Sequence, residues 1–381
     1  MTSASRRWEN LGIAAGAAAA VLFAAFDLYQ WAAAYAADHF HNDFTFYLAA
    51  ARIGLVHGWP SIYDLHLQQA ELNAMGSGIT VAELARYISP PPVAWLALPL
   101  TPLPYPVAYW TWSALLVAAL CATWFWAAPV AGRARVIYLL AAVGWLPVIY
   151  GLQLGQPGLL VAAGVAVSYA LLRAGHQWWA GIALGAMVFK PQLAFLLPLA
   201  LVAAGQYRAF AASAIALGAL ALVSVIALGP GGVSAYVDRL SFASNVPVNQ
   251  ALTLGFRPAQ ILIAAWTMLV IYRLRGRGIE WTYACALVGG MLATPYVHLD
   301  DLAMLGLAGC FVLRADAPRW NWIYVLAGVI AVEGEPFWGP WPVIVAELGA
   351  LALLSAAALR SRADLTLPQI DARPLELRPK Q

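Results

Sequence analysis

The feature that most constrains this chain is the length of its apolar segments. From Leu11 to Ala37 the only charged residue is Asp27. Because about 20 apolar residues in a helix cross the hydrocarbon core of a bilayer, this segment is predicted to span a membrane. Further apolar segments of full or half that length lie near residues 91–103, 105–128, 136–150, 157–172, 178–204, 209–229, 258–274, 280–294, 300–313, 320–332 and 340–359.

Composition leads to the same class of protein. Of the 381 residues, 62% are hydrophobic and 10% are charged, whereas a soluble domain carries about 25% charged residues. Inside lipid, a helix satisfies its own backbone hydrogen bonds. We therefore predict an all-α integral membrane fold, a polytopic bundle of about 10–13 transmembrane helices. Residues 1–360 are expected to form one membrane domain.

Basic residues predict the orientation of the chain, because loops rich in Arg and Lys stay in the cytoplasm. A flexible cytoplasmic tail is expected at 361–381, and residues 38–90 and 230–257 are expected on the other side. We predict a multi-pass protein of the cell (inner) membrane. The segments expected in the cytoplasm are the N-terminal Arg pair and residues 272–278, 313–319 and 360–362.

Two topologies remain open between residues 91 and 204. In one, 91–128 is a single kinked crossing and 178–204 divides at Lys190–Pro191. In the other, 91–103 and 105–128 cross separately and 178–204 crosses once. Both topologies leave the C-terminus inside.

The two segments expected outside the membrane are too long for simple turns. Residues 38–90 contain amphipathic helical patterns, and Asp64 is predicted to cap a helix that begins at Leu65. Residues 230–257 contain Gly, Ser and Asn and are expected to be loop-like. A turn containing Glu333 and Glu335 is expected to be solvated.

Asp43 is the first acid after the first predicted span. A helix that begins near Asn42 would place Asp43 and Tyr47 on one face. The helix dipole would then keep the carboxylate ionised. An ionised carboxylate at the membrane surface suits a general base, although an ordinary acid at the start of an interfacial helix is the alternative.

Lys190 is one of only two lysines in the chain and stands between two apolar half-segments. Charges at such positions are costly and are functional candidates by default. A compact ammonium could bind a phosphate group. The alternative is a side chain that extends from a helix end to the membrane surface.

Two further polar segments interrupt the apolar pattern. The stretch TPYVHLDD, residues 294–301, gathers His298, Asp300 and Asp301 at one turn, where they could share a proton or orient a hydroxyl. The stretch GLQLGQPG, residues 151–158, places Gln156 in a Gly-rich break of the kind that lines cavities. Each could also be an ordinary turn.

Several function classes lack support. No run of basic residues suggests nucleic acid, and no P-loop, serine-hydrolase or zincin pattern occurs. One His with two acids is too few ligands for a dedicated metal site. We expect neither a metal nor a resident cofactor.

Five segments together resemble glycosyltransferase family 87, whose members include polyprenol-phosphate-mannose-dependent α-1,2-mannosyltransferases of the GT-C type. The resemblance covers roughly residues 40–310, and the segments occur in the family's order. They are NDFTFYLAAARIGLVHGWPSIYD (42–64), YISPPPVAWLALPLTPLP (87–104), GQPGLLVAAGVAVSYALL (155–172), AGIALGAMVFKPQLAFLLPL (180–199) and TPYVHLDDLAML (294–305). Asn42, Pro157, Tyr296 and Leu299 depart from the family pattern.

The resemblance implies a GT-C-like membrane enzyme that transfers a hexose, mannose by preference, from a polyprenyl-phosphate donor to a hydroxyl of a lipid or glycan acceptor. The active site would face the periplasm or the cell exterior. Asp43 would act as base, with His298 as the second catalytic residue. The donor phosphate would bind Lys190, Arg52 and Arg257. The acceptor cavity would be lined by Tyr47, Tyr63, Gln156, Gln192, Asp300 and Asp301.

A transporter or flippase of lipid-linked sugars is the competing hypothesis, because broken helices and buried charges also suit transport. The chain shows no inverted repeat, and it has a long ordered segment after the first span. Both features favour the enzyme.

Overall fold

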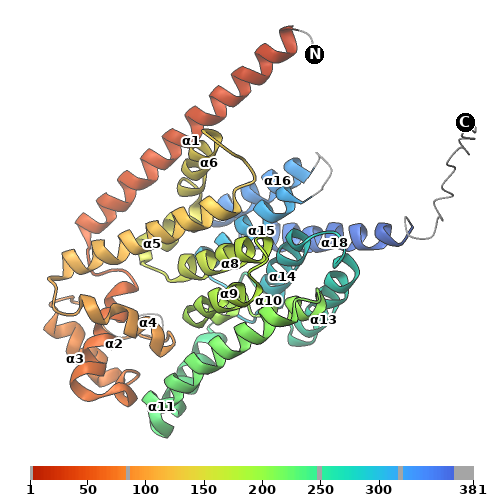
Figure 1. Ribbon diagram of the computed structural model, residues 1–381. Coiled ribbons are helices and arrows are strands. Elements are labelled where there is room, and N and C mark those ends of the chain that lie inside the picture. The colour runs from red at the N-terminus through yellow and green to blue at the C-terminus, as the bar shows by residue number, and fades with distance from the viewer. Residues whose placement is uncertain (1–2, 83–85, 247–250, 316–320, 364–381) are drawn as a thin grey trace, which may run out of the picture.

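The computed structural model describes residues 3–82, 86–246, 251–315 and 321–363. Within these ranges every regular element is a helix and no strand occurs (Figure 1). The first half of the chain forms α1 (Ser3–Ala37), α2 (Phe44–His57), the 3₁₀ helix η1 (Trp59–Ser61), α3 (Leu65–Ala74), α4 (Pro91–Ala97), η2 (Leu98–Leu100), α5 (Tyr105–Ala127), α6 (Ala134–Val143), α7 (Leu146–Leu154) and α8 (Gly158–Arg173).

The second half of the chain continues in the same all-helical way. Its elements are α9 (Gln177–Ala183), η3 (Leu184–Phe189), η4 (Pro191–Leu193), α10 (Leu196–Ala203), α11 (Tyr207–Asn245), α13 (Arg257–Leu274), α14 (Ile279–Ala293), η5 (Leu299–Leu302), α15 (Ala303–Arg314), α16 (Asn321–Glu333), α17 (Glu335–Trp338) and α18 (Trp341–Ala363). Parts of the segments expected at 38–90, 230–257, 313–319 and 361–381 lie outside the described residues.

Among the residues that the structure describes, four helices are long and apolar enough to cross a membrane alone, namely α1, α5, α11 and α18. The pair α6 and α7, bent by 63°, forms a fifth candidate. This confirms an all-α polytopic membrane protein. The remaining apolar helices have 10–17 residues, which is shorter than the ~20 residues a straight span needs. The expected 10–13 crossings therefore depend on how these shorter helices pair.

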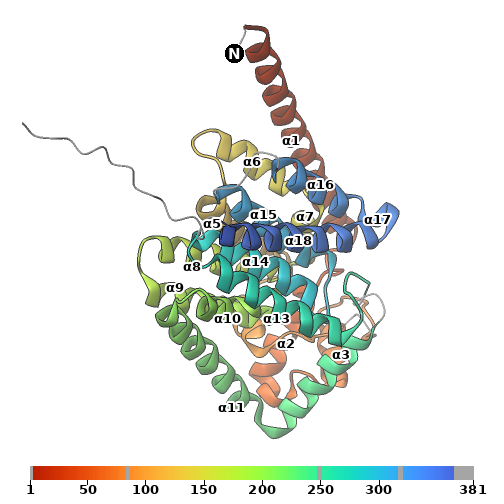
Figure 2. The same cartoon turned by 90° about the vertical axis from the view of Figure 1, so that its right-hand side faces the viewer.

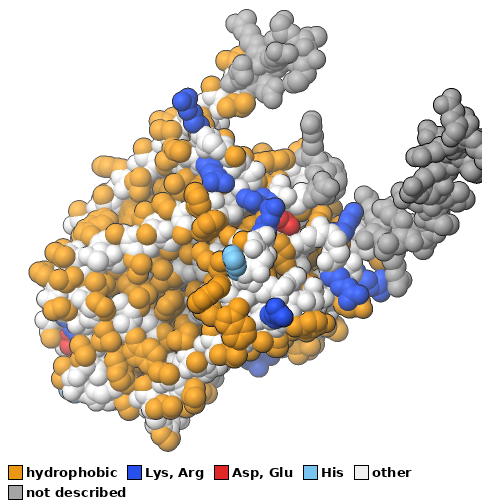
Figure 3. Space-filling model, viewed as in Figure 1, with side chains coloured by type: hydrophobic (Ala, Val, Ile, Leu, Met, Phe, Trp, Pro, Cys, Tyr) orange, Lys and Arg blue, Asp and Glu red, His pale blue; other side chains and the backbone are white. Residues whose placement is uncertain are grey.

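The helices divide into a lipid-facing shell and a packed centre. Of the residues in the apolar stretches of α1 and α11, only 11% and 17% are buried. Both helices lie along the outside of the molecule (Figures 1 and 2). In α14 every residue from Trp281 to Ala293 is buried. Hydrophobic side chains cover most of the face shown in Figure 3, as expected for a surface in contact with lipid.

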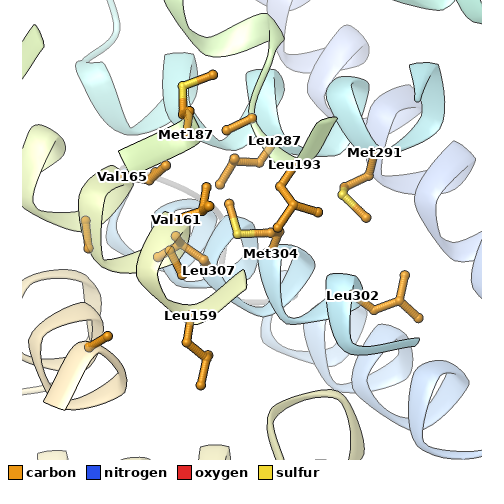
Figure 4. Close-up of a cluster of buried hydrophobic side chains, with 14 of the residues drawn as sticks. Leu159, Val161, Val165, Met187, Leu193, Leu287, Met291, Leu302, Met304 and Leu307 are labelled. Atoms are coloured by element: carbon orange, nitrogen blue, oxygen red, sulfur yellow. The ribbon is translucent and has the colours of Figure 1, made fainter. Parts of the chain in front are cut away.

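The core lies where α8, η3, η4, α14 and α15 meet. Figure 4 shows its side chains from all five elements and from the adjoining η5. They include Leu159, Val161, Val165, Met187, Leu193, Leu287, Met291, Leu302, Met304 and Leu307. The two short elements η4 and η5 thus rest on a rigid core, and they carry the polar residues described below.

The helices bear on two positions that the sequence singled out. The apolar segment 178–204, for which a division at Lys190–Pro191 and a single crossing both remained open, is interrupted at Lys190, whose backbone is non-helical between η3 and η4. Asp64 caps α3 as predicted, because its Oδ1 accepts hydrogen bonds from the backbone N–H of His66 (2.8 Å) and Leu67 (3.0 Å).

Two expectations about the external segments were wrong. Residues 230–245 are helical rather than loop-like, because α11 continues past a kink at Gly229 (φ 61°) and accommodates Pro230 there. The helix α2 is not amphipathic at its start, since every residue from Phe44 to Ala51 is buried. Its last three residues, 55–57, are exposed. At the chain's end, residues 361–363 continue α18 and are not part of a flexible tail.

Candidate active site

Asp43 lies at the N-terminus of α2, directly against the end of α7. Its backbone N–H donates to the carbonyl oxygen of Leu154 (2.9 Å). Its carboxylate makes no capping hydrogen bond to its own helix. Instead the side chain of Asn42 accepts the backbone N–H of Thr45 (3.3 Å). The Asp43 carboxylate is therefore left for other partners.

Gln156 is the side chain that holds this carboxylate. Its Nε2 donates to Asp43 Oδ2, and its Oε1 accepts a longer hydrogen bond from the Tyr47 hydroxyl (3.4 Å). Both Gln156 and Tyr47 are buried. Three of the predicted site residues thus form one connected chain, from Tyr47 through Gln156 to Asp43.

The Gly-rich break makes this approach possible. Gly155 ends α7 in the left-handed conformation (φ 72°), which glycine adopts without a steric penalty. A Cβ on Gly155 would lie 3.0 Å from the Cβ of Phe44 and 3.3 Å from Nε1 of Trp112. The indole of Trp112 also donates to the Gly155 carbonyl oxygen (2.8 Å). The start of α2 can therefore pack against the end of α7.

Burial changes the protonation of Asp43. It raises the pKa of this carboxyl to about 6, with a further upward contribution from Asp300; His298, Lys190 and the Gln156 hydrogen bond act in the opposite direction. The carboxyl is thus mostly ionised at neutral pH, although loss of hydration makes it a weaker acid than an exposed Asp. A carboxyl with a pKa near neutrality is well suited to general-base catalysis.

A second cluster joins Lys190 to two acids more than 100 positions away in the sequence. Lys190 Nζ lies 2.8 Å from Asp300 Oδ2 and 2.5 Å from Asp301 Oδ1, and all three residues are buried. A Cβ on Gly151 would lie 3.4 Å from the Cβ of Asp300, so the Gly-rich break lies beside this cluster. One ammonium and two carboxylates leave the cluster with one negative charge if all three groups are ionised.

The same cluster fixes the backbone at His298. Asp301 Oδ2 accepts the backbone N–H of His298 (3.0 Å), and the Asp301 N–H donates to the His298 carbonyl oxygen (3.0 Å). The His298 ring packs 4.9 Å from the ring of Tyr296. Among the residues that the structure describes, Asp300 Oδ1 is a buried oxygen with no hydrogen-bond partner.

Asp43 and His298 line one cavity of about 430 Å³. Its volume falls in the range of small-molecule sites, roughly 300–1,000 Å³. The cavity also contacts the external segment near Ile79 and the residues just before α13. Its polar walls are His41, Asn42, Asp43, Tyr150, His298 and Glu335. A proton acceptor and an imidazole therefore face one space large enough for a sugar.

Of the predicted site residues, only Asp43 and His298 line this cavity. Four others neither line it nor belong to the two clusters described above. Arg52 pairs with Glu71 (3.2 Å) and so ties α2 to α3. Tyr63 donates to the Ser89 carbonyl oxygen (2.9 Å), and its ring stacks on Tyr87 and Tyr236. Arg257 is exposed at the first residue of α13, and Gln192 lies half-buried in η4.

Tyr150, Asn42 and Glu335 line the cavity but were not predicted. Tyr150 directly precedes the Gly-rich break and Asn42 directly precedes Asp43, so adjacency to those motifs was an available signal. Glu335 was expected in a solvated turn and instead is half-buried at the cavity. Its position depends on how α16 and α17 fold back, which no local pattern indicates.

The described residues hold no group of three or more His, Cys, Asp or Glu side chains arranged to bind a metal ion. Independence of a metal stays a prediction.

Comparison with known proteins bears on the chain's identity. The profile of glycosyltransferase family 87 matches residues 87–332, which is well over half of the chain. No curated protein and no solved structure matches significantly. The matched region includes Gln156, Lys190 and His298, while Asp43 lies before it. With this match and its membrane helices, the chain belongs to glycosyltransferase family 87.

Proposed function

We propose that this membrane glycosyltransferase transfers a hexose, mannose first among the candidates, from a polyprenyl-phosphate donor to a hydroxyl of a lipid or glycan acceptor. The observation that carries the proposal is the placement of the Asp43 carboxylate. It is held by Gln156 and lines the same cavity as His298. A pKa of about 6 makes Asp43 mostly ionised at neutral pH while it remains basic enough to take a proton.

In the proposed step, the acceptor hydroxyl gives its proton to Asp43 as its oxygen bonds to C1 of the sugar. The bond between C1 and the phosphate oxygen breaks, and its electron pair leaves with the lipid phosphate. No nucleotide is needed, because the lipid phosphate is itself the leaving group. A single displacement would convert a β-linked donor into an α-linked product.

The departing phosphate gains negative charge and needs a positive or hydrogen-bonding partner. His298 lines the cavity, and we assign the phosphate to this residue. Arg257 is exposed and does not line the cavity. Arg52 is engaged with Glu71.

Lys190 suits a different role from the one that its sequence context suggested. Its ammonium already contacts two carboxylates, and their combined charge would repel a phosphate. We therefore propose that Lys190 fixes Asp300 and Asp301, and through Asp301 the backbone of His298.

The distribution of basic residues supports an active site on the non-cytoplasmic face. Arg314, at the end of α15, donates to the carbonyl oxygen of Ala128 (2.8 Å), and Arg173, at the end of α8, pairs with Glu280 (3.2 Å). Figure 3 shows Lys and Arg side chains gathered toward one end of the molecule. The helix α8 begins beside the site at Gly158 and ends at Arg173, about 23 Å away at 1.5 Å per residue. Basic ends face the cytoplasm, so the Asp43 cavity would open on the other side.

A panel of radiolabelled donors tests this proposal. Membranes containing the protein would be incubated with polyprenyl-phosphate mannose, polyprenyl-phosphate glucose and the corresponding nucleotide sugars, and products would be separated and identified. We expect transfer from a polyprenyl-phosphate sugar and none from nucleotide sugars. Movement of the lipid-linked sugar across liposomes containing purified protein, without any glycosylated product, would support the transporter hypothesis instead.

A further inference from the structure

A second cavity, of about 480 Å³, lies between α14, α15, α16 and α18. It shares no lining residue with the Asp43 cavity. Its walls are mostly apolar, with small residues such as Gly309 and Ala350 among them. Along α18 the lining runs from Val343 to Ala357, which is about 21 Å at 1.5 Å per residue. The space is therefore elongated and suits a chain.

Several polar residues line this mostly apolar space, among them Glu347, Trp145 and Asn321. Glu347 is 4% exposed and sits in the candidate span of α18. Trp145 is 8% exposed, and its Nε1 is a buried atom with no hydrogen-bond partner among the described residues. Those residues also supply no hydrogen-bond or ion-pair partner for the Glu347 carboxyl group. Polar groups in such surroundings are costly unless they are hydrogen-bonded.

The neighbouring residues that the structure describes fix the Trp145 ring and give Glu347 no counter-ion. A Cβ on Gly306 would lie 2.5 Å from the Trp145 ring, so the indole is tightly seated against α15. Beside Glu347, the hydroxyl of Tyr324 is already used by the Ala346 carbonyl oxygen. Arg277 lies toward the other end, where it donates to the Ala357 carbonyl oxygen (3.3 Å). It is therefore not a counter-ion for Glu347.

The chemistry of the two groups defines a ligand. The indole N–H can only donate a hydrogen bond, and a carboxyl group accepts one in either protonation state. A hydroxyl group both donates and accepts, so it can pair with either the Trp145 N–H or the Glu347 carboxyl group. We infer that this cavity is a binding site for a lipid that carries a free hydroxyl and a long apolar chain. The inference is independent of the proposed transfer reaction.

Photoaffinity labelling tests the site. The purified full-length protein in phosphatidylcholine nanodiscs would be exposed to a long-chain fatty alcohol bearing a diazirine, and to its methyl ether, which lacks the O–H donor. Labelled peptides are expected from α15, α16 or α18, and the alcohol should label roughly 3- to 10-fold more strongly at equal concentration, in line with the loss of a hydrogen bond. Equal labelling by alcohol and ether would overturn the assignment of a hydroxyl ligand.

Variants test the two polar groups and the volume of the cavity separately. Trp145→Phe keeps the ring and removes the N–H, so labelling by the alcohol should fall roughly 3- to 10-fold. Glu347→Leu should have a similar effect. Ala350→Phe fills the cavity and should abolish labelling by both probes. Trp341→Phe is the matched control for Trp145→Phe, because Trp341 is 72% exposed at the start of α18 and does not line the cavity.

Gel filtration and thermal melting would establish that each variant is folded. If Glu347→Leu does not fold, the conservative Trp145→Phe still decides the question. Labelling that persists in Ala350→Phe, or that is unchanged in Trp145→Phe, would show that the probe binds elsewhere and would refute the site. Stronger labelling by a diazirine-bearing alkyl phosphate than by the alcohol would also refute it, since it would indicate an anionic head group near Arg277.

Discussion

Replacing Gln156 with Met should move the pH dependence of the enzyme without abolishing transfer. The amide of Gln156 donates to the Asp43 carboxylate, and this hydrogen bond lowers the pKa of Asp43 against the stronger effect of burial. Met has nearly the same length and shape but cannot donate. Loss of the hydrogen bond therefore favours the protonated form of Asp43, and the pKa should rise above its present value of about 6.

The size of the shift follows from the strength of the bond. A hydrogen bond to a charged group contributes about 1.5–3 kcal/mol, and one pKa unit corresponds to about 1.4 kcal/mol. The pKa of Asp43 should therefore rise by roughly 1–2 units, to about 7–8. At pH 7 the ionised fraction would fall from about nine-tenths to between a half and a tenth. Because the base acts in its ionised form, kcat/KM at pH 7 should fall by roughly 2- to 10-fold.

The assay is kcat/KM for glycosyl transfer measured from pH 5 to pH 9. The acidic limb of the profile should move to higher pH in Gln156→Met, and activity should return toward that of the wild type near pH 9. Gln153→Met is the matched control, since Gln153 lies in the same Gly-rich break and does not contact Asp43. A uniform loss at every pH, with no movement of the limb, would refute the assigned role of Gln156.

Three further predictions concern stability, measured as thermal unfolding in detergent. Asp43→Asn should stabilise the protein by about 3 kcal/mol above pH 6, because burial raises the pKa of Asp43 in the folded protein from 3.8 to about 6. The gain in stability should shrink as the pH falls from about 6 to 3.8. An equal gain at pH 4 and pH 7.5 would contradict this. Lys190→Met leaves two buried carboxylates without their cation and should lower the free energy of unfolding by about 3–5 kcal/mol. Adding Asp301→Asn should restore part of this stability. An unchanged melting temperature would show that the cluster is not structural. Asp64→Ala should cost about 1 kcal/mol through loss of the α3 cap, whereas Asp64→Asn should cost much less; equal losses would argue against capping.

The fold class could be predicted from the sequence because it follows from local features of each segment, such as its length and its apolar residues. Apolar length identified the membrane helices, the Lys190–Pro191 pair marked a break, and Asp64 marked a helix start. The kink at Gly229 misled the prediction, because Gly and Pro can end a helix or bend it. Only the packing of Tyr236 on Tyr63 distinguishes these outcomes at this position.

The sequence singled out several residues that the fold brings together, but it did not predict their pairings. Asp43, Gln156, Lys190 and Asp301 were identified by their unusual context, yet the contacts between them cross more than 100 positions of sequence. Sequence alone suggested a free cation at Lys190, whereas the fold places two acids against it. The raised pKa of Asp43 has a related origin, since the burial of its carboxyl group depends on elements that are remote in the chain.

The most direct test of the proposed mechanism is transfer by Asp43→Asn compared with wild type and with Asp64→Asn. Each purified protein would be mixed in excess with radiolabelled polyprenyl-phosphate mannose and membrane lipid acceptors, and product formation in a single turnover would be followed at pH 7.5. Loss of a general base lowers the rate by about 10²–10⁴-fold, so Asp43→Asn should show that loss while Asp64→Asn stays near wild type. Wild-type turnover by a folded Asp43→Asn protein would contradict the assignment of Asp43 as the base.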